Sequence, residues 1–256
     1  MRSALARQWL LFRIACQMLT RVPAARGIDY APELDAAAVR YYPAVGILVG
    51  LAGGAVFAAS YGLFGPFSAA VLALAATALL TGAMHEDGLA DTADGIGGGR
   101  TAERALEIMR DSRIGVYGVL ALGLILAVRV FAVAGVPPWI GFALLIAAHG
   151  LSRWSVVVVI ATANYVRSSG IASPVAGPVT QTAHLTAGGT ALACLVLLGL
   201  AASPAAAFGA LIGSICGHVA ARAFFQPKLK GYTGDTLGAT QQVSEIGAYL
   251  GLLACL

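Results

Sequence analysis

Long apolar segments, separated by short polar or turn-forming connections, dominate the hydrophobic pattern of the chain. A membrane-spanning helix needs about 20 mostly apolar residues. Six segments meet this requirement, at 43–64, 66–84, 114–135, 138–161, 185–202 and 204–225. A seventh helix is predicted at 236–256, with a polar first half and an apolar second half. Residues 4–20 are interrupted by Arg7 and Arg13, a pattern typical of an amphipathic helix in the membrane interface.

This pattern predicts an all-α protein, a polytopic integral membrane helix bundle with about seven membrane-embedded helices and an N-terminal interfacial helix. The composition agrees, because 59% of the residues are hydrophobic and 11% are charged, against roughly 25% charged in a soluble domain. The 32 glycines suit helices that pack backbone to backbone in lipid. No long polar block interrupts the apolar segments, so we expect one integral membrane domain over residues 1–256.

Charged residues occur in alternate connections between the predicted helices. Arginines precede the first span and occupy the connection 85–113, whereas the connections near 65, 135–138 and 203 carry no charge. By the positive-inside rule, we expect a multi-pass protein of the cytoplasmic (inner) membrane with its polar motifs on the cytoplasmic side. The net charge of +4 comes from scattered arginines without a basic stripe, so no nucleic-acid partner is expected.

The stretch HEDGLADTADG, residues 85–95, follows 44 residues without a charged side chain. On a helix, Asp87, Asp91 and Asp94 fall within an arc of about 60°, and three carboxylates on one face repel one another unless a cation neutralises them. Oxygen ligands favour a hard ion such as Mg²⁺ or Mn²⁺. We predict these three aspartates as metal ligands, with Glu86 as a weaker one; the alternative is a solvated helix end.

Several other polar residues are candidates for binding phosphate or for moving a proton. Arg110 and Arg113 surround Asp111 in MRDSRIGVYG, 109–118. Arg129 and Arg153 lie inside predicted spans, where a charge costs roughly 2.5–3.5 kcal/mol on insertion scales and usually faces a polar interior. Arginines hold phosphate oxygens well, although topological anchors and ion pairs are the alternatives. The candidates for a general base are His85, Asp111, Asp235 and Glu245.

The chain resembles the cobalamin synthases, the adenosylcobinamide-GDP ribazoletransferases, in six stretches that occur in the family's order. HEDGLADTADG at 85–95 and LEIMRDSRIGVYG at 106–118 are the most specific. The others are TRVPAAR at 20–26, YYPAVGILVG at 41–50, LSRW at 151–154 and TGDTLGA at 233–239.

The resemblance implies a Mg²⁺-dependent transferase of a substituted phosphate group at a late step of cobalamin biosynthesis. The adenosylcobinamide phosphoryl group would pass from adenosylcobinamide-GDP to the 3′-hydroxyl of α-ribazole, or of its 5′-phosphate, with release of GMP. The acidic stretch would hold the metal, and Arg110, Arg113, Arg129 and Arg153 would contact the diphosphate. The implied partners are these two substrates and the lipid bilayer, and a homo-oligomer is compatible with the sequence.

Two other functions share parts of this pattern. A phosphatidyltransferase or prenyltransferase would use the same acidic metal chemistry on a lipid alcohol or an isoprenoid. The DGLADTADG stretch, however, lacks the early arginine of the first class, and 226–245 lacks the second acidic repeat of the other. A transporter would place acids at the bilayer midplane and show two related halves.

Overall fold

The computed structural model describes residues 2–28, 32–167 and 179–256. Every element named in these ranges is helical, so the all-α prediction is confirmed. Within the described ranges, Tyr165 and Tyr232 also form an isolated parallel β-bridge. The elements are α1 Arg2–Leu19, α2 Pro32–Ala38, a 3-10 turn Val39–Tyr41, α3 Tyr42–Thr81, α4 Met84–Gly98, α5 Ala102–Ile108, α6 Val116–Ala134, α7 Pro138–Thr162, α8 Gln181–Ala201, α9 Pro204–Leu229 and α10 Gly234–Leu253.

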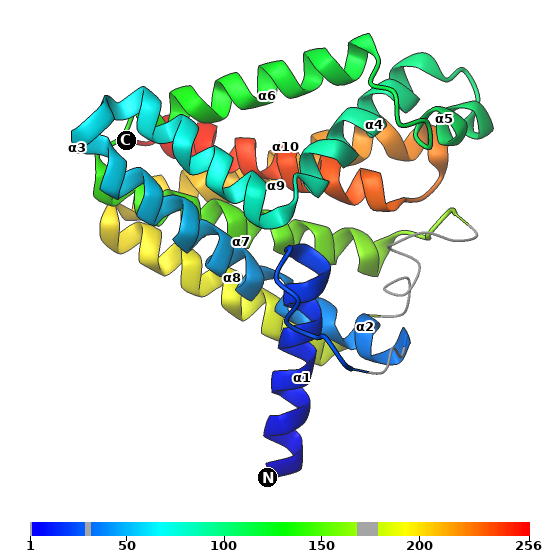
Figure 1. Cartoon of the computed structure of the whole chain (residues 1–256), viewed down its shortest axis with the longest axis horizontal. Helices are drawn as coiled ribbons and strands as arrows, with labels where there is room; N and C mark the ends of the chain where they lie inside the picture. The colour runs from blue at the N-terminus through cyan, green and yellow to red at the C-terminus, as the bar shows by residue number, and fades with distance from the viewer. Residues whose placement is uncertain (1, 29–31, 168–178) are drawn as a thin grey trace.

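Helix α3 contains the break predicted between the first two spans. Gly65 has φ 78° and ψ 169°, outside the helical region. A positive φ costs glycine little, and Pro66 has no N–H to continue the helix. The chain therefore reverses direction there, and α3 consists of two arms (Figure 1).

Five helical stretches of the described chain are long and apolar enough to cross a membrane: Glu33–Thr81, which contains both arms of α3, Val116–Ala134, Pro138–Thr162, Gln181–Ala201 and Pro204–Leu229. A multi-pass membrane bundle is thereby confirmed. Helix α10 falls outside this set because its first half is polar. The count of about seven membrane-embedded helices stays a prediction that depends on dividing α3 and on including α10.

The connections sort to the two ends of the bundle as the charge alternation requires. The turn between the two arms of α3, the α6–α7 turn and the α8–α9 turn lie at one end, on the left of Figure 1. The charged connection through α5 and the start of α10 lie at the other end. Helix α1 runs across the direction of the long helices and exposes Leu5 and Trp9, with 69% and 61% of their surface accessible. This orientation suits a helix that rests in the membrane interface.

Small residues let α9 and α10 pack at the distance of backbone contact. A Cβ on Gly213 would collide with the main chain of Gly247, and one on Gly209 with the main chain of Gly251. Helix α3 meets α7 in the same way, since a Cβ on Gly50 would lie 2.5 Å from Cα of Ile146. This is the close packing expected of glycine-rich membrane helices. It places the polar half of α10 in the interior, between α9, α7, α4 and α6.

Candidate active site at the charged end of the bundle

Helix α4 carries the acidic stretch, and its first anchor is a contact with the start of α6. The backbone N–H groups of Gly115 and Gly118 donate to the two carboxylate oxygens of Asp94 at 2.7 and 2.9 Å. These N–H groups have no partner within their own helix because they belong to its first turn. A carboxylate at this position also interacts favourably with the helix dipole. Asp94, predicted as a metal ligand, therefore caps α6 with both oxygens.

A second anchor holds the other end of α4. The ammonium of Lys228, near the end of α9, donates to the main-chain oxygens of Ile96 and Gly99 at 2.5 and 2.7 Å. Those carbonyls end α4, where a cation offsets the partial negative charge of the helix terminus. Together the contacts of Asp94 and Lys228 fix α4 relative to α6 and α9. The orientation of the remaining acidic side chains follows from this fixed helix.

A cavity of ≈ 180 Å³ opens beside α4 at the charged end of the bundle. One part of its wall is polar and contains His85, Asp87, Arg153, Arg167 and Asp235. The rest of the wall is mostly apolar and comes from α1, α3, α4, α7 and α10, and from Tyr165 in the segment after α7. Its lining residues are Met18, Leu19, Tyr42, Met84, Val156, Tyr165, Gly234, Leu237 and Gly238.

Asp87 and Asp235 line the cavity, and Asp91, one helical turn after Asp87 on α4, is influenced by both. Asp87 is exposed, whereas Asp91 and Asp235 are half-buried. Burial, followed by the charges of Asp87 and Asp235, raises the pKa of Asp91 to about 7. Sequence reasoning placed Asp87 and Asp91 on one face of a helix, and the fold adds Asp235 from α10. The raised pKa of Asp91 thus has two physical causes, the burial of its carboxyl group and then the negative charges beside it.

Arg167 was not predicted, yet its guanidinium forms an ion pair with Asp235 at 2.7 Å and lines the same cavity. A short main-chain contact sets its position, because Tyr232 donates to Asn164 at 2.8 Å and receives a bond from Val166 at 3.0 Å. Arg167 stood alone in the long connection after α7, and a lone cation in a loop carries no sequence signal. Only the pairing of two distant segments brings it to the acidic residues.

The donor set of the cavity suits a divalent cation in its chemistry. Among the described residues, no group of three or more His, Cys, Asp or Glu side chains is close enough to form a metal site. Asp87, Asp91 and Asp235 nevertheless offer oxygen ligands, the kind that a hard cation prefers. A cation would also relieve the repulsion that raises the pKa of Asp91. We therefore regard these three aspartates, more than Asp94, as fitting a metal.

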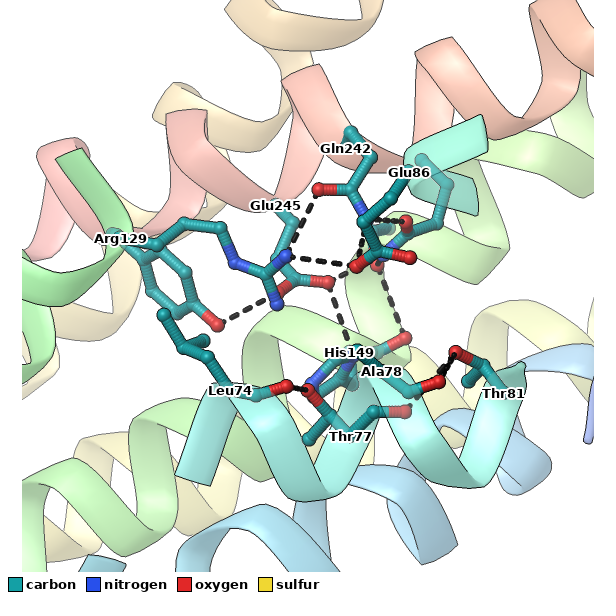
Figure 2. A network of polar contacts seen from close by, with 12 residues as sticks. Leu74, Thr77, Ala78, Thr81, Glu86, Arg129, His149, Gln242 and Glu245 are labelled. Carbon is teal, nitrogen blue, oxygen red and sulfur yellow. Dashed lines mark hydrogen bonds and ion pairs between the residues drawn. The ribbon is translucent and has the colours of Figure 1, made fainter. Parts of the chain in front are cut away.

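A buried polar network lies next to the cavity, centred on Glu245 of α10 (Figure 2). Arg129 of α6 lies 2.6 Å from one of its carboxylate oxygens, which also accepts from Tyr249 at 2.8 Å. His149 lies 3.0 Å from the other oxygen. Arg129 and Glu245 have 1% and 0% of their side-chain surface exposed. The two ions therefore compensate each other inside the bundle, as burial requires.

Glu86 connects this network to α4. Its carboxylate lies 3.2 Å from Arg129 and accepts from Gln242 at 3.0 Å, and Gln242 accepts from Arg129 at 2.9 Å (Figure 2). Glu86 and Arg129 thus face each other in the interior. The sequence predicted Glu86 as a weaker metal ligand and Arg129 as a phosphate ligand. Metal and phosphate binding by these two residues stay predictions. Their observed contacts hold the first turn of α4 against α6 and α10.

Arg153 stands between the network and the cavity. It lines the cavity wall, and its guanidinium lies 2.9 Å from Nδ1 of His149 and 3.9 Å from Glu245. The side chain is 1% exposed, so it faces the interior and not lipid, as expected for a charge at membrane depth. His85 lines the cavity from α4, where burial and the charge of Arg153 hold its pKa well below the usual range. The imidazole of His85 is therefore neutral.

The residues of the MRDSRIGVYG stretch lie partly at a second hollow, of ≈ 440 Å³, between α4, α5 and α6. Arg113 and Asp111 line it and form an ion pair of 2.5 Å. The hydrogen bonds from Arg113 lower the pKa of Asp111 to about 2, so its carboxylate is a weak base. Arg110 is exposed and is not among the residues that line either hollow. The predicted candidates are thus divided among a cavity, a buried network and this second hollow.

Comparison with known proteins agrees with the resemblance read from the motifs. The model of the family described as cobalamin-5-phosphate synthase matches residues 11–253. The adenosylcobinamide-GDP ribazoletransferase of Leptothrix cholodnii is 42% identical over 98% of both chains. The protein of the same name from Bradyrhizobium diazoefficiens is 45% identical over 91% of this chain and 89% of its own. No solved structure matches the chain. The chain therefore belongs to the cobalamin-5-phosphate synthase family of adenosylcobinamide-GDP ribazoletransferases, and it is a transferase of cobalamin biosynthesis.

Proposed function

We propose that the protein joins adenosylcobinamide-GDP to α-ribazole, or to α-ribazole 5′-phosphate, in a Mg²⁺-dependent reaction at the cytoplasmic face of the inner membrane. The 3′-hydroxyl oxygen of the ribose attacks the phosphorus attached to cobinamide. The bond from that phosphorus to the bridging oxygen breaks, GMP leaves, and the hydroxyl proton is released. The products are adenosylcobalamin, or its 5′-phosphate, and GMP.

The observation that carries the proposal is the cavity at the charged end, which Asp87, Asp235, Arg153 and Arg167 line, with Asp91 one helical turn after Asp87 on α4. Asp87, Asp91 and Asp235 would hold the metal, which when bound neutralises charge on the diphosphate oxygens. Arg153 and Arg167 line the same cavity and carry the donors that phosphate oxygens accept. In phosphoryl transfer, positioning and charge compensation supply most of the catalysis.

The proton of the attacking hydroxyl needs an acceptor, and the four predicted candidates differ in their surroundings. Asp235 and His85 line the cavity, whereas Asp111 belongs to the second hollow. Glu245 is engaged by Arg129, His149 and Tyr249 within the bundle. His85 is the acceptor that we favour, because it lines the cavity and, unlike Asp235, is not proposed to hold the metal.

A direct test is the release of GMP by the purified protein in lipid nanodiscs. We expect GMP and a cobalamin product only when adenosylcobinamide-GDP, an α-ribazole acceptor and Mg²⁺ are all present. Supplying the acceptor with and without its 5′-phosphate identifies the preferred one. A lipid alcohol or an isoprenoid alcohol in place of α-ribazole tests the rival transferases. Release of GMP without any acceptor-derived product would contradict the proposal.

A further inference from the structure

The apolar part of the cavity has no role in the binding of phosphate or metal described above. We propose that this part, which we call the apolar slot, binds the flat benzimidazole base of the acceptor nucleoside and directs its ribose toward Asp235. The slot is formed by Met18, Leu19, Tyr42, Met84, Val156 and Leu237. This inference rests on the proposed function, because it assigns a subsite for one of the two substrates.

Four of the six slot side chains are buried and come from separate helices, whereas Met18 is half-buried and Met84 is exposed. Leu19 of α1, Val156 of α7 and Leu237 of α10 have 6%, 5% and 8% of their surface exposed. Tyr42, at the start of α3, is 3% exposed, and its hydroxyl donates to the sulfur of Met18 at 3.8 Å. Thioether and aromatic groups make favourable contacts with aromatic rings. The walls therefore offer contact area to a flat ring and few hydrogen bonds.

Size and polarity decide which part of the substrates fits. The cavity of ≈ 180 Å³ is smaller than the roughly 300–1,000 Å³ of pockets that enclose a whole drug-sized ligand. It is too small for a corrin ring. A guanine base has several N–H and carbonyl groups on its edge, and burying them without partners costs about 1–3 kcal/mol each. The benzimidazole of α-ribazole, whose ring carries no N–H or carbonyl group, loses little on entering an apolar slot.

The polar wall belongs to the same cavity as the apolar slot, and it determines which way the ribose of the acceptor points. Asp87, Asp235 and Arg167 line the cavity together with the apolar side chains. A nucleoside whose base fills the slot places its ribose hydroxyls toward these charged groups. The 3′-hydroxyl then lies on the side where the diphosphate would be held. The slot thus acts as a positioning device for the acceptor, in addition to contributing affinity.

The slot also gives α1 a function in the enzyme. Met18 and Leu19 are the last two residues of α1, the helix that runs across the bundle, and both line the cavity. The segment after α1 is tied to the membrane helices, because the backbone N–H of Arg21 donates to the carbonyl of Leu80 at 2.8 Å. An interfacial helix fixed in this way forms one wall of the acceptor subsite.

The test uses substitutions in the slot that leave the charged wall intact. Val156→Phe fills the slot, and Val156→Ala enlarges it. Val158→Phe is the matched control, because Val158 lies on the same helix, two residues away, and does not line the cavity. Each full-length protein in nanodiscs is assayed for binding of α-ribazole by calorimetry and for the KM of each substrate. The KM of adenosylcobinamide-GDP reports whether the folded site is retained.

We expect Val156→Phe to raise the Kd and the KM of α-ribazole by about 10-fold or more, with the KM of adenosylcobinamide-GDP within about 2-fold of the unsubstituted protein. Val158→Phe should change neither KM. Val156→Ala removes two methyl groups from the slot and should shift the preference toward an acceptor with a larger, three-ring base by about 10-fold, the scale of effect that such a change has in a hydrophobic pocket. The Val156→Ala variant keeps the inference testable even if the Val156→Phe protein does not fold.

The outcomes separate this inference from the proposed function. An unsubstituted protein that forms no product from the two substrates contradicts the proposed function itself. An active protein in which the Val156 variants leave the acceptor KM and base preference unchanged overturns the slot. An active protein in which they raise only the KM of adenosylcobinamide-GDP also overturns it, because the slot would then hold part of the donor.

Discussion

The guanidinium of Arg167 lies 2.7 Å from the carboxylate of Asp235 and joins the segment after α7 to the start of α10. We expect Arg167→Gln to lower kcat/KM by about 10- to 100-fold, from the loss of charge-assisted bonds worth roughly 1.5–3 kcal/mol. Steady-state kinetics of GMP release measures the effect. Arg167→Lys should recover part of the activity because it keeps the charge. Normal activity of Arg167→Gln would place this ion pair outside the catalytic site.

The pKa of Asp91 predicts a dependence of stability on pH in the absence of divalent cations. Burial and the neighbouring carboxylates raise this pKa to about 7 from its ordinary value of 3.8. The folded protein therefore holds a proton that the unfolded chain releases, and the carboxyl opposes folding increasingly from about pH 4 to about pH 7. Asp91→Asn removes this effect. Its apparent Tm in EDTA should exceed that of the unsubstituted protein by a margin that grows over this range and is constant above it.

The control for this experiment is Asp111→Asn. Hydrogen bonds from Arg113 lower the pKa of Asp111 to about 2, so its carboxylate does not oppose folding at neutral pH. A gain in Tm that is equal at pH 4 and pH 8 for Asp91→Asn would show that the carboxyl is not the cause.

Asp94 is expected to act mainly on stability. Because its carboxylate accepts the N–H groups of Gly115 and Gly118, Asp94→Ala should cost about 0.5–2 kcal/mol, the range measured for the loss of a helix cap. Thermal unfolding in nanodiscs would show this as a lower apparent Tm. Asp87→Ala is the matched comparison, and we expect it to retain the Tm and to lose Mg²⁺-dependent turnover. An unchanged Tm for Asp94→Ala would contradict the cap.

Glu245 and Arg129 should behave as a coupled pair. Glu245→Gln leaves the buried guanidinium of Arg129 without its closest carboxylate, and breaking a buried ion pair costs about 3–5 kcal/mol. The double variant Arg129→Met with Glu245→Leu removes both charges and should recover much of the apparent Tm. If Glu245→Gln instead keeps its Tm and loses only kcat, Glu245 acts in catalysis and not in positioning.

The orientation in the membrane is tested at the two ends of the bundle. Ser112 and Gly135 are exposed small residues, at the charged end and the uncharged end respectively. In a background without the exposed Cys216 and Cys255, an impermeant thiol reagent added to intact cells should label Gly135→Cys and not Ser112→Cys. Labelling of Ser112→Cys alone would invert the topology.

The helices and the acidic stretch could be predicted from the sequence because both depend on local patterns. Twenty apolar residues specify a span through their contact with lipid, and Gly65 with Pro66 specifies a break through the backbone itself. Asp87 and Asp91 share a helix face because helical geometry alone puts them there. The charge alternation likewise follows from the cost of moving arginine across lipid.

The partners of each charge were decided by the tertiary structure. Asp94 and Asp87 belong to one motif, yet one caps α6 and the other lines the cavity. Arg129 and Glu245 are 116 residues apart and meet at 2.6 Å only because α6 and α10 pack together. Spacing along a helix specifies the direction of a side chain but not the element that faces it. Glycine-mediated packing of α9 on α10 brings the polar half of α10 into the interior, and with it the contacts that distinguish ligand, cap and buried ion pair.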